Sequence, residues 1–238
     1  MLRFFFVILV SLPHILYYIA KITYIEFRPE RYSEEYRYKI CQNATKAVKR
    51  NCFIHTETYG TENLPKEGGY VMFANHQGKY DALGIVFSHS KPCTVVIDKK
   101  RSHLPIASQF VSLMRGTRLD RENPREQVKG ILKVIEEVKQ GRRYIIFPEG
   151  GYYHNQNNVR EFLPGSFKCA IKAKSPIVPV ALIDSYKPFE LNSLRPVTTQ
   201  VHFLPPIYYE EYKDMSSRQI AELTREKIIN VIEQVVVK

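Results

Sequence analysis

Apolar residues follow two different patterns along the 238-residue chain. Short apolar runs at 70–74, 144–147 and 177–183 have the length of buried strands. Longer segments at 123–141 and 217–236 place apolar residues every three or four positions, which is typical of amphipathic helices. Further strands are predicted at 53–59, 93–97 and 198–204, and further helices at 33–50, 82–87, 104–114 and 165–174. Because strands and helices alternate, the pattern predicts an α/β fold class.

The first thirty residues differ from the rest of the chain. Residues 4–20 carry no charge, and seventeen residues of helix reach about 25 Å, at the short limit for spanning a bilayer. Pro13 interrupts the run, so we expect two short helical pieces, which suit burial in one leaflet better than a clean span. Lys21 and Arg28 follow, which favours the cytoplasmic face. We therefore predict a membrane anchor at 1–30 and one catalytic domain at 31–238; a cleaved signal peptide is the alternative.

Charge and composition narrow the classes of partner. The net charge of +11 suits an anionic partner, such as a phosphate or an acidic membrane surface. Nucleic acid is not expected, because no zinc-finger, helix-turn-helix or RNP-type pattern is present. The four cysteines form no CxxC pair and read as buried, reduced thiols. The histidines lack HxxxH spacing, so we predict no metal site.

A histidine and an aspartate lie in the segment between the strand at 70–74 and the helix that follows it. His76 and Asp81 are five positions apart, a spacing that would point them roughly 140° apart on one helix. A loop can instead bring the carboxylate to the imidazole, where it fixes the tautomer and favours the protonated ring. The other ring nitrogen is then free to take a proton from a hydroxyl. Alternatively, Asp81 caps the helix and His76 is merely polar.

A glutamate follows a second predicted strand. Glu149 comes directly after 144–147, and ligands of α/β sheets bind outside the carboxyl ends of the strands. We therefore expect His76 and Glu149 at the same edge of the sheet.

Four sequence blocks together resemble a known family. Asn75-His76 with Asp81 matches the NHxxxxD motif of the glycerolipid acyltransferases, and 147–150 matches their FPEG motif. In 116–121, which looks like their GxxFIDR block, Arg118 and Leu119 replace the usual aromatic and apolar pair before Asp120-Arg121, and 176–180 matches their IVPV block. The chain thus resembles this family over 53–206, and within it the bacterial 1-acylglycerol-3-phosphate acyltransferases.

The resemblance implies a fold and a reaction. The expected fold is a mixed, mostly parallel sheet flanked by helices. The expected reaction moves a fatty acyl chain from a thioester of acyl carrier protein or coenzyme A to 1-acylglycerol 3-phosphate, giving phosphatidate in phospholipid synthesis. His76 would be the base and Asp81 its partner, and no cofactor is expected, since the thioester is a co-substrate. Three alternatives stay open: another acceptor (glycerol 3-phosphate or another lysophospholipid), hydrolysis of a thioester or lipid, and a silent lipid-binding protein.

The resemblance also indicates substrate-binding residues. The candidates are Asn75, Lys99, Arg118, Arg121, Glu149 and Gly150. Arg121 is the first candidate for holding the acceptor's phosphate, while Lys100 and Arg101 are expected to be solvated surface charges. The family's third motif usually continues as FPEGTR, but this chain has Gly151 and Tyr152 after Gly150. That departure removes an arginine from the expected place and leaves open how phosphate is held and which acceptor is used.

Overall fold

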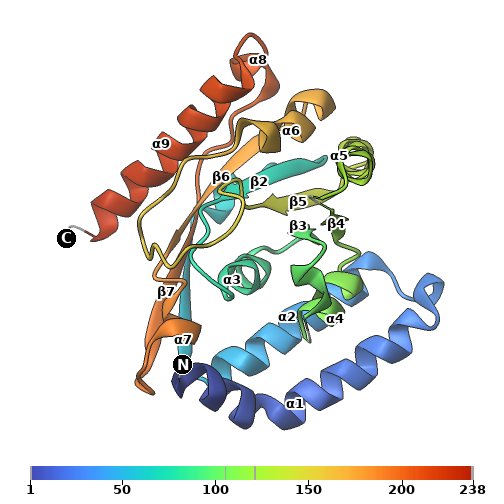
Figure 1. Ribbon diagram of the computed structural model, residues 1–238, viewed down its shortest axis with the longest axis vertical. Coiled ribbons are helices and arrows are strands. Elements are labelled where there is room, and N and C mark those ends of the chain that lie inside the picture. The colour runs from blue at the N-terminus through green and yellow to red at the C-terminus, as the bar shows by residue number, and fades with distance from the viewer. Residues whose placement is uncertain (1, 105, 121, 237–238) are drawn as a thin grey trace.

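A computed structural model describes residues 2–104, 106–120 and 122–236, and its seven-stranded sheet lies between two layers of helices (Figure 1). The strands are β1 (Ile54–Tyr59), β2 (Tyr70–Ala74), β3 (Thr94–Asp98), β4 (Thr117–Leu119), β5 (Arg143–Ile146), β6 (Ile177–Ile183) and β7 (Val197–Phe203). Their order is β1-β7-β6-β2-β5-β3-β4. All neighbours are parallel except β6 and β7, which pair antiparallel. The predicted mixed, mostly parallel α/β sheet is confirmed.

The helices form a layer on each face of the sheet (Figure 1). One layer contains α1 (Leu2–Glu26), α2 (Glu34–Asn51), α3 (Asp81–Ser88) and α4 (Ala107–Leu113). The other contains α5 (Pro124–Lys139), α6 (Lys168–Ala173) and α9 (Ser217–Val236). Shorter helices are α7 (Lys187–Glu190), α8 (Tyr209–Tyr212), η1 (Pro29–Arg31), η2 (Thr61–Asn63), η3 (Arg101–His103) and η4 (Pro164–Phe167).

Strand β2 supplies side chains to both cores. Tyr70, Met72 and Ala74 pack in the core under α1–α4, whereas Val71 and Phe73 pack in the core under α5, α6 and α9. Successive side chains of a strand point to opposite faces, and both faces of this strand are covered. All five side chains are fully buried as a result. The strand therefore gives a rigid base to the loop that follows it.

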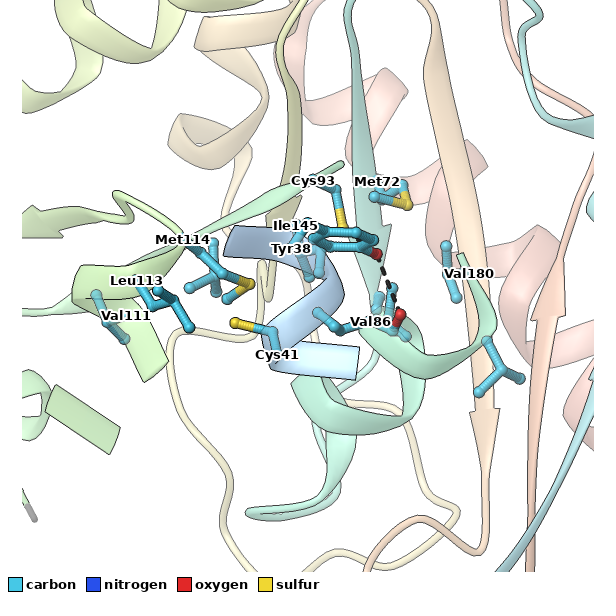
Figure 2. Packing of buried hydrophobic residues seen from close by; sticks show 14 of the residues in the cluster. Tyr38, Cys41, Met72, Val86, Cys93, Val111, Leu113, Met114, Ile145 and Val180 are labelled. Atoms are coloured by element: carbon cyan, nitrogen blue, oxygen red, sulfur yellow. Dashed lines mark hydrogen bonds between the residues drawn. The ribbon is translucent and has the colours of Figure 1, made fainter. Parts of the chain in front are cut away.

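An aromatic residue, Tyr38, fixes helix α2 in the core under α1–α4. Tyr38 lies among buried sulfur and aliphatic side chains (Figure 2). Its hydroxyl donates to the carbonyl oxygen of Val86 on α3 at 3.1 Å. Burial of the ring without a partner for the hydroxyl would cost stability, so this bond fixes α2 against α3.

The N-terminal segment differs from the prediction in one respect. In place of two pieces divided at Pro13, α1 is one continuous helix. Proline keeps a helical φ angle, and it removes one hydrogen bond here at an exposed position. Packing on both sides offsets that loss, because Val7 precedes Pro13 and is buried, as are Ile22 and Ile25 beyond it. By length and composition α1 is able to cross a membrane, yet it packs against α2, α4 and α7.

The helix predicted at 104–114 is shorter than expected. Helix α4 begins at Ala107, after Ile106 with a φ of 71° and Pro105, which lies outside the described residues. A positive φ at a β-branched residue is incompatible with a continuing helix. The preceding residues instead form the turn η3, directly beyond the carboxyl end of β3.

His89 is buried near the amino-terminal end of β2, and its burial predicts that the fold is less stable in acid. Nε2 of His89 accepts from the Tyr70 hydroxyl at 2.6 Å, and Nδ1 donates to the carbonyl of Lys91 at 2.6 Å. Burial lowers the pKa of His89 to about 4, with Arg143 and Lys91 adding to the shift. The unfolded histidine binds a proton near pH 6.5, so folding stability falls as the pH drops from about 6.5 to about 4, by roughly 3 kcal/mol at most.

Urea unfolding of wild type and His89→Gln between pH 7 and pH 4.5 measures this contribution. Glutamine keeps a donor and an acceptor without titrating in this range, so we expect a flatter pH dependence for the variant. Parallel curves for the two proteins would show that His89 does not cause the loss.

Candidate active site

The segment between β2 and α3 folds back on itself and brings His76 to Asp81. Nδ1 of His76 donates to Oδ2 of Asp81 at 2.7 Å. Because a carboxylate only accepts, the proton of the neutral ring is on Nδ1. Nε2 then carries the lone pair, and it forms no hydrogen bond with the described residues. The predicted histidine–aspartate contact is therefore present, with the free nitrogen available to a ligand.

Asp81 is held in place by the loop itself. Its side chain is fully buried, and Oδ2 also accepts from the backbone amides of Gln77 at 2.6 Å and Gly78 at 2.9 Å. Asp81 is the first residue of α3, where the helix dipole favours a negative charge. These contacts orient the carboxylate before any ligand binds.

Two amide side chains fasten the loop to β6. Asn75 donates to the carbonyl of Leu182 at 3.0 Å and accepts from its amide at 2.7 Å, so its side chain extends the β2–β6 ladder. Gln77 is fully buried, donates to the carbonyl of Leu182 at 2.8 Å and accepts from the amide of Ser185 at 2.7 Å. It also donates to Asn157 at 2.9 Å, which connects the loop to 151–163. The loop between β2 and α3 is thus hydrogen-bonded both to the end of β6 with Ser185 and to the segment 151–163.

Glu149 lies beside His76, as predicted, and its carboxylate is buried. Oε1 accepts from the backbone amide of His76 at 2.8 Å, and Oε2 from that of Arg160 at 3.4 Å. Burial raises the pKa of Glu149, while these two hydrogen bonds act in the opposite direction. Gly150 follows with a φ of +77°, which other residues adopt only with strain. The glutamate therefore joins the β5 turn to the loop of His76.

Aromatic rings enclose the imidazole of His76. The ring of Phe147 stacks on it with centroids 4.4 Å apart, and Tyr152 meets it edge-to-face at 5.4 Å. Phe147 and Gly150 also line an apolar cavity of about 240 Å³. The other walls come from β3, β4, β5, α5, η4 and α6, and include Val96, Ile131, Val134 and Ile146. Phe147 thus borders both the imidazole and this cavity, although His76 itself does not line the cavity.

The basic candidates differ in what they contact. Nζ of Lys99 pairs with Oδ2 of Asp120 at 3.0 Å. Arg118 is half-buried and donates to the hydroxyl oxygens of Ser102 at 3.2 Å and Ser112 at 2.8 Å. Arg121 lies outside the described residues. The expected substrate contacts of these residues, and those of Asn75, Glu149 and Gly150, stay predictions.

Three residues at the site were not singled out from the sequence as functional. Gln77 occupies a variable position of the NHxxxxD motif, and Asn157 lies in an irregular segment. Arg101 was expected to be a solvated charge, although its guanidinium lies 5.8 Å from the centre of the Tyr152 ring. Only its place beyond the end of a predicted strand indicated a site.

Helix α1 approaches the same edge of the sheet. Nζ of Lys79, in the loop between His76 and Asp81, lies 4.4 Å from the ring centre of Phe4. Phe4 also contacts Phe189 edge-to-face at 6.1 Å. The N-terminal end of the apolar helix is therefore next to the candidate site.

Comparison with known proteins places this chain among acyltransferases. A family model described as Acyltransferase matches residues 55–183. A 1-acyl-sn-glycerol-3-phosphate acyltransferase of Saccharomyces cerevisiae is 28% identical over 82% of this chain and 68% of its own length. One of Salmonella typhimurium is 30% identical over 65% of this chain and 63% of its own length.

A solved structure shares the fold. The crystal structure of the 1-acyl-sn-glycerophosphate acyltransferase of Thermotoga maritima aligns with a TM-score of 0.81 and 19% identity, over all of this chain and 96% of the other. This likeness shows the fold, and the family model and the relatives confirm the resemblance predicted from the sequence motifs.

Proposed function

Because this chain belongs to the Acyltransferase family, we propose that it transfers a fatty acyl chain from an acyl thioester to the free hydroxyl of 1-acylglycerol 3-phosphate. The product is phosphatidate, and the donor is a thioester of acyl carrier protein or coenzyme A. The observation that carries the proposal is the 2.7 Å bond from Nδ1 of His76 to Asp81, which leaves Nε2 free at the edge of the sheet. The names of the yeast and bacterial relatives support this acceptor.

The reaction begins with deprotonation of the acceptor. Nε2 of His76 takes the proton of the hydroxyl as its oxygen attacks the thioester carbonyl carbon. The imidazole becomes an imidazolium, and the carboxylate of Asp81 at 2.7 Å stabilises that charge. No protein nucleophile is needed, because the hydroxyl oxygen forms the new bond itself.

The second half of the reaction returns the proton. The tetrahedral intermediate breaks its carbon–sulfur bond, and the thiolate leaves with the proton carried by Nε2 of His76. One ester forms, one thioester is cleaved, and the histidine is neutral again. The same nitrogen serves as base and then as acid, so its position must be held throughout.

Three buried side chains supply that positioning. Asn75 and Gln77 fix the loop to β6, and Glu149 binds the backbone amide of His76 itself. We assign them this positioning role, in preference to the direct substrate contacts expected for Asn75 and Glu149, because their polar atoms already have partners in the protein. The apolar cavity bounded by Phe147 would receive part of a fatty acyl chain.

The contacts of α1 support a membrane-bound enzyme whose helix lies along one leaflet. Arg3 is buried, and its guanidinium donates to the carbonyls of Cys52, Pro188, Ser193 and Arg195 at 2.6–3.1 Å. The start of α1 is therefore fixed to the catalytic domain, and its other end is connected through η1 to α2. With both ends on one side, the exposed apolar residues of α1 would enter the near leaflet on the cytoplasmic side.

Two substitutions on that surface test the membrane contact. Leu9 and Leu16 are 71% and 59% exposed, so Leu9→Asp/Leu16→Asp is expected to lower partitioning onto phospholipid vesicles at least about tenfold without unfolding the protein. Flotation with phosphatidylglycerol–phosphatidylcholine vesicles measures this. Val128→Asp/Leu132→Asp is the control, since these residues are 56% and 58% exposed on α5, across the sheet. Equal flotation of both variants and wild type would contradict the role of α1.

An acceptor panel tests the proposed activity. Purified protein is given palmitoyl-coenzyme A or palmitoyl-acyl carrier protein with lysophosphatidate, glycerol 3-phosphate, lysophosphatidylcholine or monoacylglycerol, and the lipids are identified by mass spectrometry. We expect phosphatidate from lysophosphatidate as the main product. Preferred acylation of another acceptor would overturn this part of the proposal.

A further inference from the structure

Three consecutive basic residues follow β3, and their charges are not equivalent. Lys99 pairs with Asp120, and Lys100 with Glu122. The guanidinium of Arg101 is exposed and forms no ion pair or hydrogen bond with the part of the chain that the structure describes. Arg101 is therefore the member of this group with an unused charge.

The guanidinium of Arg101 lies at the candidate active site. It is 5.8 Å from the centre of the Tyr152 ring, and that ring meets the imidazole of His76 edge-to-face at 5.4 Å. The ring of Tyr152 thus contacts both His76, the candidate base, and the unpaired guanidinium of Arg101. A cation–π contact with an aromatic ring helps to orient a guanidinium.

The turn that carries Arg101 is fixed by its neighbours. Oδ1 of Asp98 accepts from the backbone amides of Lys100 at 3.0 Å and Arg101 at 3.3 Å. The buried hydroxyl of Ser102 donates to the carbonyl of Lys99 at 2.7 Å and accepts from Arg118 at 3.2 Å. Arg118 thus helps to hold η3, and the backbone of Arg101 is anchored on both sides.

We propose that Arg101, supported by the ring of Tyr152, binds the phosphate monoester of the acceptor and so replaces the arginine that the third motif lacks in this chain. Tyr152 stands at the position of that arginine and acts as a positioning residue for Arg101. The inference rests on the proposed function, because it takes the acceptor to be 1-acylglycerol 3-phosphate. It adds a specificity-determining residue at a position where a solvated charge was expected.

The chemistry fits a phosphate monoester. An arginine presents paired N–H donors that match two phosphate oxygens, and charge-assisted bonds of this kind are the strong ones. The free hydroxyl and the phosphate of the acceptor are on neighbouring carbons of one glycerol unit, so their two binding groups must lie near each other, and Tyr152 contacts both His76 and Arg101. Coenzyme A and the phosphopantetheine of acyl carrier protein also carry phosphate, so the test must separate acceptor from donor.

Arg101→Ala provides the central measurement. We expect the KM for lysophosphatidate to rise about tenfold or more, since a charge-assisted bidentate contact is lost. The KM for palmitoyl-coenzyme A and the turnover of a phosphate-free monoacylglycerol should change less than about twofold. Lys100→Ala is the matched control: it removes the same charge from the adjacent residue, whose ammonium pairs with Glu122. It should leave all three values near those of wild type.

Further variants distinguish the contribution of the Tyr152 ring from that of the Arg101 charge. Tyr152→Phe keeps the ring and should keep the KM for lysophosphatidate, whereas Tyr152→Leu should raise it as Arg101→Ala does. Arg101→Lys keeps the charge without the paired donors and should be intermediate. The double variant Arg101→Ala/Tyr152→Arg places an arginine at the family's position and should recover part of the lost affinity.

The outcomes distinguish a failure of the proposed function from a failure of the proposed role of Arg101. No transfer to lysophosphatidate by the wild-type protein would overturn the proposed function, and with it this acceptor for Arg101. If the wild type is active and Arg101→Ala keeps its KM for lysophosphatidate, the role of Arg101 alone is overturned. A selective rise in the KM for palmitoyl-coenzyme A would likewise overturn it, by assigning the residue to the donor's phosphates.

Discussion

His76→Ala is expected to lower the turnover number for acyl transfer by about two to four powers of ten, because it removes the proposed general base. The side chain of His76 is partly exposed and contacts chiefly Asp81 and the rings of Phe147 and Tyr152. The β2–α3 loop keeps its other bonds through Asn75 and Gln77. The variant should therefore fold and still bind substrates while failing in catalysis.

Steady-state kinetics with circular dichroism and thermal unfolding check this expectation. His55→Ala is the control, since it also removes an imidazole, here an exposed one on β1. It should retain wild-type turnover. A folded His76→Ala protein that turns over at the wild-type rate would refute the assignment of the base.

Asp81→Asn is expected to lower turnover by about a hundredfold or more, because the imidazolium of the proposed mechanism loses its counter-charge. The amide oxygen of asparagine is able to accept the bonds now made to Oδ2 from His76, Gln77 and Gly78. Its amide nitrogen would then lie at the place of Oδ1, which is buried and has no partner among the described residues. An unsatisfied buried donor costs about 1–3 kcal/mol, so a lower free energy of unfolding is expected as well.

Both effects are measurable on one preparation by kinetics and urea unfolding. Asp214→Asn makes the same chemical change at an exposed site and serves as the control. Turnover of Asp81→Asn within a fewfold of wild type would show that the charge of Asp81 is not required.

Much of the fold was predictable because local pattern and burial agree. The strands β2 and β6 and the helix α9 have the predicted bounds. The strand β4 was not predicted: Thr117–Leu119 is three residues long, and its pairing with β3 is what makes it a strand. The continuous α1 was also missed, since the packing that holds the helix through Pro13 comes from α2, α4 and α7.

The candidate site shows the same contrast between local and long-range determinants. His76 and Asp81 are near in sequence, so a loop joining them was a local prediction. The roles of Asn75 and Gln77 depend on Leu182 and Ser185, more than a hundred residues away. The placement of Arg101 against Tyr152 depends on how the β3 and β5 turns meet. Sequence motifs indicated the candidate reacting groups, while the contacts that support those groups required the three-dimensional structure.

The central claim is that His76 activates a lipid hydroxyl and not water. The most direct test is to measure thiol release from palmitoyl-coenzyme A and phosphatidate formation together, with and without lysophosphatidate. We predict that thiol release depends on lysophosphatidate and equals phosphatidate formed, and that both vanish in His76→Ala. Thiol release at the same rate without the acceptor, accompanied by free palmitate, would contradict the account and indicate a hydrolase.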